Sequence, residues 1–136
     1  MSAQAPLVLV VDDSDDYRRI VARVLASGGY RTAVAGSAEE ARQLLTALAP
    51  DAAVLDWNLP GESGVELSRW MRGEPRWAGL PILLLSVNAR VEDQANGLRL
   101  GEASAYMVKP FQPDELLSRL RALLAGGSRA KGVRPR

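Results

Sequence analysis

The chain has 136 residues, 47% hydrophobic and 24% charged, which is the balance of a single globular domain. Its 17 Lys and Arg against 16 Asp and Glu give a net charge of +1 at pH 7, and its apolar stretches are too short to span a membrane. The absence of Cys and His excludes disulfides, thiolate metal sites and a histidine general base. We find no signal-peptide pattern and expect a cytoplasmic protein without membrane attachment.

Five short apolar runs predict buried parallel strands, because they are rich in Val, Leu and Ile and are followed by turn residues. They comprise residues 7–11, 31–35, 51–55, 81–85 and 104–108. The second run is the least apolar, so we expect it nearer an edge of the sheet. The strands alternate with five helical patterns, which predicts an α/β, doubly wound (βα)₅ domain with one parallel five-stranded sheet and helices on both faces.

The helices are predicted from their caps and apolar faces. The first follows Ser14 and stops at residues 28–29, the second begins with the Ser37–Glu40 capping box, and the third covers residues 64–71. The fourth covers residues 91–100 and the fifth starts at residue 113. In the first helix the predicted packing face is led by Ile20 and Val24, with Val21 and Leu25 as secondary candidates. The other predicted packing residues are Ala41, Leu44, Leu45, Leu48, Val91, Ala95, Leu98, Leu116, Leu117, Leu120, Leu123 and Leu124.

Polar side chains follow four of these strands. Asp12 and Asp13 end the first, Asp56 follows the third, Ser86 the fourth and Lys109 the fifth. Because ligands of open parallel sheets bind at the carboxyl ends of the strands, we expect these five side chains to converge. Three adjacent carboxylates repel one another unless a cation relieves them, and oxygen ligands without His or Cys suit Mg²⁺.

The alternative interpretation of such acids is that they complement a helix dipole. We prefer it for Asp15 and Asp16, which fall in a first helical turn, and prefer metal binding for Asp12 and Asp13. Lys109 is one of only two Lys beside 15 Arg, and a compact ammonium suits a confined phosphoryl oxygen better than a planar guanidinium.

Four motifs together resemble the receiver domain of bacterial two-component response regulators over about residues 6–125. They are VVDD at 10–13, LDWNLPGESG at 55–64, ILLLSVNA at 82–89 and YMVKPF at 106–111. The resemblance implies a flavodoxin-like fold and a phosphorelay function. Asp56 would accept a phosphoryl group from a sensor histidine kinase or a phosphotransfer protein. Such a signalling domain is no enzyme on other substrates and catalyses only its own phosphorylation and dephosphorylation.

The resemblance also assigns the metal ligands. Asp13 would bind Mg²⁺ directly and Asp12 largely through water, with Asp56 and the backbone carbonyl of Asn58 completing the protein ligands. Lys109 would contact the phosphoryl group and precede a cis proline.

The resemblance further implies a switch. Ser86 would contact the phosphoryl group and move inward, which lets Tyr106 change rotamer. The responding face would be the fourth helix, fifth strand and fifth helix. That face would control an output domain or protein, or a phosphorylation-dependent homodimer, and the domain itself would bind no nucleic acid.

The sequence differs from the usual receiver pattern at two positions, and two other functions are considered beside the receiver function. Val87 is bulkier than the usual residue there, and Glu62 replaces a common Met. The Asp13–Ser14–Asp15 spacing is superficially similar to the start of a Mg²⁺-dependent phosphohydrolase, and a receiver fold can serve as an interaction module that is never phosphorylated.

We expect residues 1–5 to be an N-terminal extension of the domain and the basic residues 126–136 to be a tail or the start of a linker.

Overall fold

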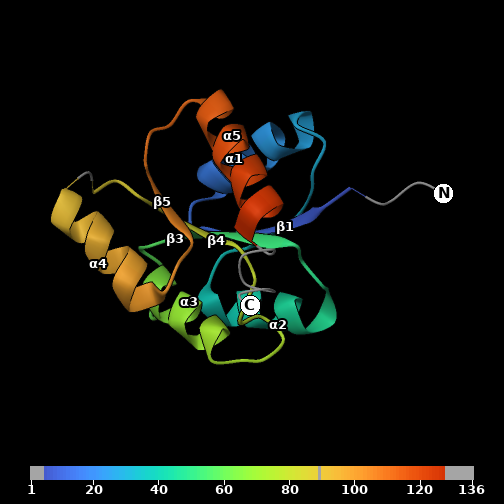
Figure 1. Ribbon diagram of the computed structural model, residues 1–136. Coiled ribbons are helices and arrows are strands. Elements are labelled where there is room, and N and C mark those ends of the chain that lie inside the picture. Colours follow the sequence, from blue (N-terminus) through green and yellow to red (C-terminus); the bar gives the residue numbers. More distant parts are fainter. Residues whose placement is uncertain (1–4, 89, 128–136) are drawn as a thin grey trace.

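Five parallel strands form one sheet in the computed structural model, which describes residues 5–88 and 90–127 (Figure 1). They are β1 (Leu7–Val11), β2 (Arg31–Ala35), β3 (Ala52–Asp56), β4 (Ile82–Ser86) and β5 (Ala105–Val108). The strand order is β2-β1-β3-β4-β5, so β2 lies at an edge as predicted. The three central strands are buried along their whole length, which explains their continuous apolar sequences.

Helices cover both faces of the sheet, which confirms the doubly wound prediction (Figure 1). One face carries α1 (Asp15–Ser27) and α5 (Pro113–Ala122), the latter followed by a short π-helical turn, η1 (Leu123–Gly127). On the opposite face lie α2 (Ala38–Ala47), α3 (Gly64–Arg72) and α4 (Val91–Gly101). Among the described residues, no helix is long and apolar enough to cross a membrane.

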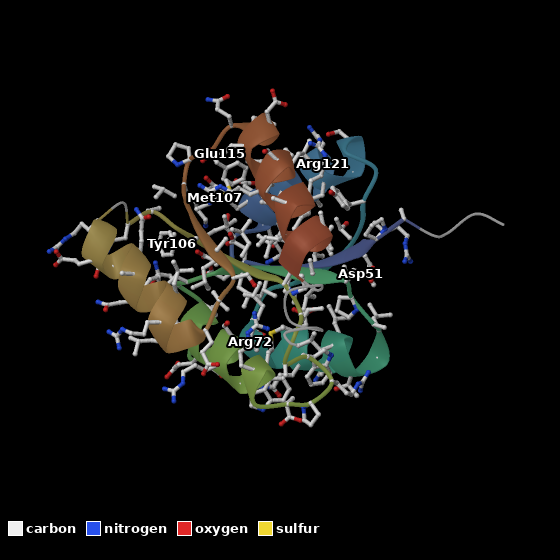
Figure 2. The ribbon with its side chains drawn as sticks, in the orientation of Figure 1. Asp51, Arg72, Tyr106, Met107, Glu115 and Arg121 are labelled. Atoms are coloured by element: carbon white, nitrogen blue, oxygen red, sulfur yellow. The ribbon has the colours of Figure 1, made fainter. Side chains whose placement is uncertain are left out.

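Alternate residues of β1, β3, β4 and β5 supply the two apolar layers of the core, whereas β2 contributes to one layer only. Val8 and Val10 face α1 and α5, whereas Leu9 and Val11 belong to the layer under α2 and α3. On β5, Tyr106 belongs to the second layer and Met107 to the first, and Figure 2 shows the two side chains on different sides of the strand. The sheet is therefore buried on both sides at its three central strands.

Three of the predicted packing residues are exposed instead. Ile20 is 49% exposed because the packing face of α1 is centred on the fully buried Val21 and Leu25. Leu48 is 39% exposed because α2 ends at residue 47, and the extended backbone of the next residue leaves the helix. Ala95 of α4 is also exposed, whereas Leu98 is partly buried; the side chain of Val91, predicted on the same face, lies outside the described part of the structure.

The far end of α3 is tied to the turns that lead into two strands. Arg72 donates from Nε to the Glu102 carbonyl (2.8 Å) and from Nη1 to the Leu80 carbonyl (2.6 Å). Its Nη2 also donates to the Ser104 hydroxyl (3.2 Å), and Figure 2 labels this side chain among the helices below the sheet. One guanidinium therefore joins α3 to the segments before β4 and β5.

The predicted terminal extensions fall almost wholly outside the described part of the chain. Residues 1–4 and 128–136 are not described, so the N-terminal extension and the basic tail remain predictions. The tail includes Arg129, Lys131, Arg134 and Arg136.

Candidate functional site

The parallel sheet brings the predicted site residues to one edge. Asp12 and Asp13 follow β1, Asp56 and Ser86 are the last residues of β3 and β4, and Lys109 follows β5. Backbone hydrogen bonds extend the sheet past these ends, since the Lys109 N–H donates to the Ser86 carbonyl (2.8 Å). The rigid sheet therefore fixes where all five side chains begin.

Three carboxylates form the centre of the site. Asp12, Asp13 and Asp56 each offer one oxygen, and these oxygens all lie within 4.8 Å of one another. Asp12 and Asp56 are only 2% and 5% exposed, whereas Asp13 faces solvent. One Asp12 oxygen accepts the Ser14 N–H (2.9 Å), which fixes that carboxylate at the start of α1. A donor set of hard oxygens, partly open to water, fits Mg²⁺.

The Lys109 ammonium is buried between two of these acids. Its Nζ lies 2.9 Å from Asp12 Oδ2 and 3.2 Å from Asp56 Oδ1, and the residue is 9% exposed. The peptide bond between Lys109 and Pro110 is cis. Two of the three acids predicted to converge, Asp12 and Asp56, are thus in direct contact with Lys109, although the three residues come from three different strands.

The charges of this cluster perturb one another. Burial raises the pKa of Asp56 above its ordinary value, the neighbouring Asp12 charge raises it further, and Lys109 opposes both. Burial alone would lower the pKa of Lys109, but the hydrogen bond to Asp12 and the two negative charges together raise it. The raised pKa values mean that the site disfavours the charged form of Asp56 and favours that of Lys109.

The loop after Asp56 is held close to the carboxylate. The Asn58 backbone N–H donates to the Asp56 carboxylate, and the Gly64 N–H donates to the Trp57 carbonyl (2.8 Å). A Cβ at Gly64 would lie 2.1 Å from the Asp56 carbonyl oxygen, so only glycine permits this close approach. Glu62 in the same loop forms a two-fold ion pair with Arg42 of α2.

Ser86 and Tyr106 meet the same short segment after β4. The Ser86 hydroxyl, 2% exposed, accepts the Asn88 N–H (3.1 Å), and the Tyr106 hydroxyl donates to the Asn88 carbonyl (2.9 Å). The Tyr106 ring is buried and packs edge-on against Trp57, with 5.9 Å between ring centroids. Tyr106 therefore links the segment after β4 to Trp57, the residue that follows Asp56.

A cleft of about 260 Å³ opens beside the acids. It is lined by Trp57, Asn58, Ser86, Val87, Asn88 and Asp93. Val87 is 70% exposed at its rim, so its bulk lies at the entrance rather than against the acids. The cleft therefore opens on Ser86 and on Trp57 and Asn58, the two residues that follow Asp56.

Two residues beside this site were not identified from the sequence. Arg18 donates to the Asp12 carbonyl (2.7 Å), and the ring of Tyr17 lies 4.1 Å from Lys109 Nζ. Both sit in the first turns of α1, which Ser14 caps. In the sequence, Tyr17 and Arg18 are marked only by their position a few residues after Asp12 and Asp13.

Comparison with known proteins identifies the family. A family model described as the response regulator receiver domain matches residues 8–121. The chain is 36% identical over 117 residues to the phosphate regulon transcriptional regulatory protein PhoB of Pseudomonas aeruginosa, covering 86% of this chain and 51% of that protein. It is 38% identical over 124 residues to the transcriptional regulatory protein GltR of the same organism, covering 91% and 51%. The chain thus spans about half the length of these relatives.

Comparison with solved structures indicates the same family. The crystal structure of a protein described as a response regulator from Chloroflexus aurantiacus matches with a TM-score of 0.85 and 36% identity, covering 89% of this chain and 98% of that one. The family match covers most of the chain and the structural match covers nearly the whole of its counterpart. This chain therefore belongs to the receiver domains of two-component response regulators, which are signalling domains.

Proposed function

We propose that this domain accepts a phosphoryl group on Asp56 from a phosphohistidine of a sensor histidine kinase or a phosphotransfer protein. The observation that carries the proposal is the Lys109 ammonium in contact with both Asp12 and Asp56, at a strand edge that also holds Asp13. A buried cation fixed beside one carboxylate is the arrangement that stabilises negative charge arriving at that carboxylate.

The proposed reaction is an in-line displacement. One Asp56 oxygen attacks phosphorus, the new O–P bond forms as the P–N bond breaks, and the departing imidazole nitrogen leaves with the electron pair of that bond. Lys109 and the Ser86 hydroxyl would contact the phosphoryl oxygens. Slow attack of water on the same phosphorus would return Asp56 to its free form.

The acid cluster would hold Mg²⁺ through Asp12, Asp13, Asp56 and the backbone carbonyl of Asn58. When bound, the ion would neutralise the carboxylates and the phosphoryl oxygens. The donor set supports this assignment, because every available side-chain ligand is a carboxylate oxygen and the exposed Asp13 admits water.

The proposed output is a switch on the α4–β5–α5 face. Ser86 and Tyr106 both bond to Asn88, so a shift of Ser86 toward the phosphoryl group would alter the support of the Tyr106 hydroxyl. Tyr106 also contacts Trp57, the residue after Asp56. The relatives PhoB and GltR are named transcriptional regulatory proteins and are about twice as long as the matched segment. We therefore infer that this face controls an output domain or protein, or a phosphorylation-dependent homodimer.

Intact-mass spectrometry tests the proposal. The protein incubated with acetyl phosphate and Mg²⁺ is expected to gain one phosphoryl group, and removal of Mg²⁺ by a chelator should prevent the gain. Asp56→Asn should gain none, whereas Asp51→Asn, at the opposite end of β3, should behave as wild type. Full labelling of Asp56→Asn would refute the assignment, and multiple turnover of a simple phosphate ester would favour a phosphohydrolase instead.

A further inference from the structure

The Lys109 ammonium has a third neighbour besides its two acids. Its Nζ lies over the face of Tyr17, 4.1 Å from the ring centroid. Lys109 is 9% exposed, so this cation–π contact is largely shielded from water, where such contacts are strongest. The carboxylates of Asp12 and Asp56 and the Tyr17 ring together surround the ammonium.

The Tyr17 ring is itself held in place. Its backbone N–H donates to the capping hydroxyl of Ser14 (3.2 Å), which fixes the residue in the first turn of α1. Its ring packs against Phe111, with 6.2 Å between centroids and planes tilted by 58°. Phe111 lies two residues after Lys109, so the Tyr17 ring joins α1 to the segment after β5 through both of these residues.

We propose that Tyr17 is a positioning residue for phosphoryl transfer to Asp56, acting through Lys109. A lysine side chain is flexible, so holding it in one place costs conformational entropy. If Lys109 is already ordered beside the acceptor before the reaction, the transfer step does not bear this entropic cost. An aromatic face attracts the ammonium without the full negative charge of a carboxylate. The ammonium can therefore turn its donors from Asp56 to an arriving phosphoryl oxygen while staying in place. This inference rests on the proposed function of Asp56.

The contact can be measured without any phosphodonor. The chain has only two lysines, so lysine labelled with ¹³C at the ε-carbon gives two signals, from Lys109 and Lys131. Lys109→Gln assigns them. The ring current of Tyr17 should move the Lys109 ε-proton signal upfield of that of Lys131. Tyr17→Leu should abolish this displacement, and Tyr17→Phe, which keeps the ring, should retain it.

The role is measured by the rate of phosphorylation with acetyl phosphate and Mg²⁺. Tyr17→Leu is expected to slow phosphorylation by between about 2-fold and 30-fold, the range that one such contact contributes. Tyr17→Phe should recover most of the loss. In a Lys109→Gln background, Tyr17→Leu should not slow phosphorylation further, because the ammonium through which Tyr17 acts is already absent.

Tyr30 offers a matched control. It is another partly buried tyrosine packed on the same apolar layer, but it precedes β2 at the opposite end of the sheet. Tyr30→Leu should lower stability without changing the phosphorylation rate. Equal slowing by Tyr30→Leu and Tyr17→Leu would overturn the proposal and reduce Tyr17 to a packing residue.

Three further results would also overturn it. They are an unchanged Lys109 signal in Tyr17→Leu, a wild-type rate in that variant, and an equal loss of rate with and without Lys109. If Tyr17→Leu did not fold, Tyr17→Met would replace it and the same outcomes would decide. A wild-type protein that gains no phosphoryl group would refute the proposed function, and with it this role, even with the Lys109 signal displaced.

Discussion

Replacing Asp56 by Asn is expected to stabilise the folded protein in Mg²⁺-free buffer, although it removes an ion pair. With an effective dielectric constant of about 20, the attraction across the 3.2 Å to Lys109 is about 5 kcal/mol. The repulsion from Asp12, whose oxygen lies within 4.8 Å, is about 3.5 kcal/mol or more, and the exposed Asp13 adds a smaller amount. Attraction and repulsion therefore nearly cancel.

The cost of burying the Asp56 charge then decides the sign. Placing a carboxylate in a site only 5% exposed costs several kcal/mol, and the N–H of Asn58 returns part of it. Lys109 keeps its partner Asp12 in the variant. We expect Asp56→Asn to raise the free energy of unfolding by about 1–2 kcal/mol, the part of that cost left uncompensated.

Urea denaturation followed by tryptophan fluorescence measures the difference. Because the pKa of Asp56 is raised on folding, the folded protein retains this proton to higher pH than the unfolded chain. The stability difference should be absent below the unfolded pKa of about 4, should open as the pH rises above that value, and should be complete above the folded pKa. Mg²⁺ at about 100 times its Kd should add about 2.7 kcal/mol to wild type, which exceeds the difference and makes wild type the more stable protein.

Asp51→Asn is the control for this measurement, because Asp51 accepts the Leu7 N–H (2.8 Å) at the start of β3, away from the cluster (Figure 2). Because this variant keeps the acid cluster, Mg²⁺ should stabilise it as much as it stabilises wild type, so its stability difference from wild type should not change with Mg²⁺. A variant Asp56→Asn that is less stable than wild type at neutral pH without Mg²⁺ would refute the reasoning, since it would show that the Lys109 attraction outweighs both repulsion and burial.

Lys109→Arg should still be phosphorylated but should give smaller amide shifts in α4 and α5 with beryllofluoride, because a planar guanidinium cannot present one compact charge; shifts equal to wild type would make Lys109 a simple counter-ion. Asp13→Ala should lose the tryptophan emission change expected when wild type is titrated with Mg²⁺, and equal responses would refute the metal assignment. Arg72→Ala should lower the free energy of unfolding by about 2–4 kcal/mol because it leaves several backbone carbonyls unpaired. Arg76→Ala, which loses only a contact over the Trp77 ring, should cost about 1 kcal/mol or less, and similar losses in the two variants would contradict this account.

The fold could be predicted because its strands are buried on both sides. Continuous apolar runs such as residues 82–85 admit few other structures, and the alternation with capped helices fixed the doubly wound class. The errors lie at helix surfaces. Ile20 and Leu48 have the residue type and spacing of core positions, but helix rotation and the last helical residue are set by packing that the sequence does not display.

The convergence of the site followed from one rule about strand ends, which is why Asp12, Asp56 and Lys109 were identified together. The contact of Lys109 with Tyr17 was not, because it joins residues far apart in the chain and depends on the orientation of one ring. Arg72 was missed for a similar reason. Its partners are backbone carbonyls, which any residue supplies, so no motif marks them.

The most direct test of the central claim is to locate the acceptor among the three clustered carboxylates. The protein is phosphorylated with acetyl phosphate and Mg²⁺ and then treated with borohydride, which reduces an aspartyl phosphate to homoserine and releases the phosphate. Peptide mass spectrometry then identifies the reduced residue. The account predicts homoserine at position 56 alone, because Asp56 contacts Lys109 and directly precedes Trp57 and Asn58, which line the cleft containing Ser86. Homoserine at position 12 or 13, or at none of the three, would contradict it.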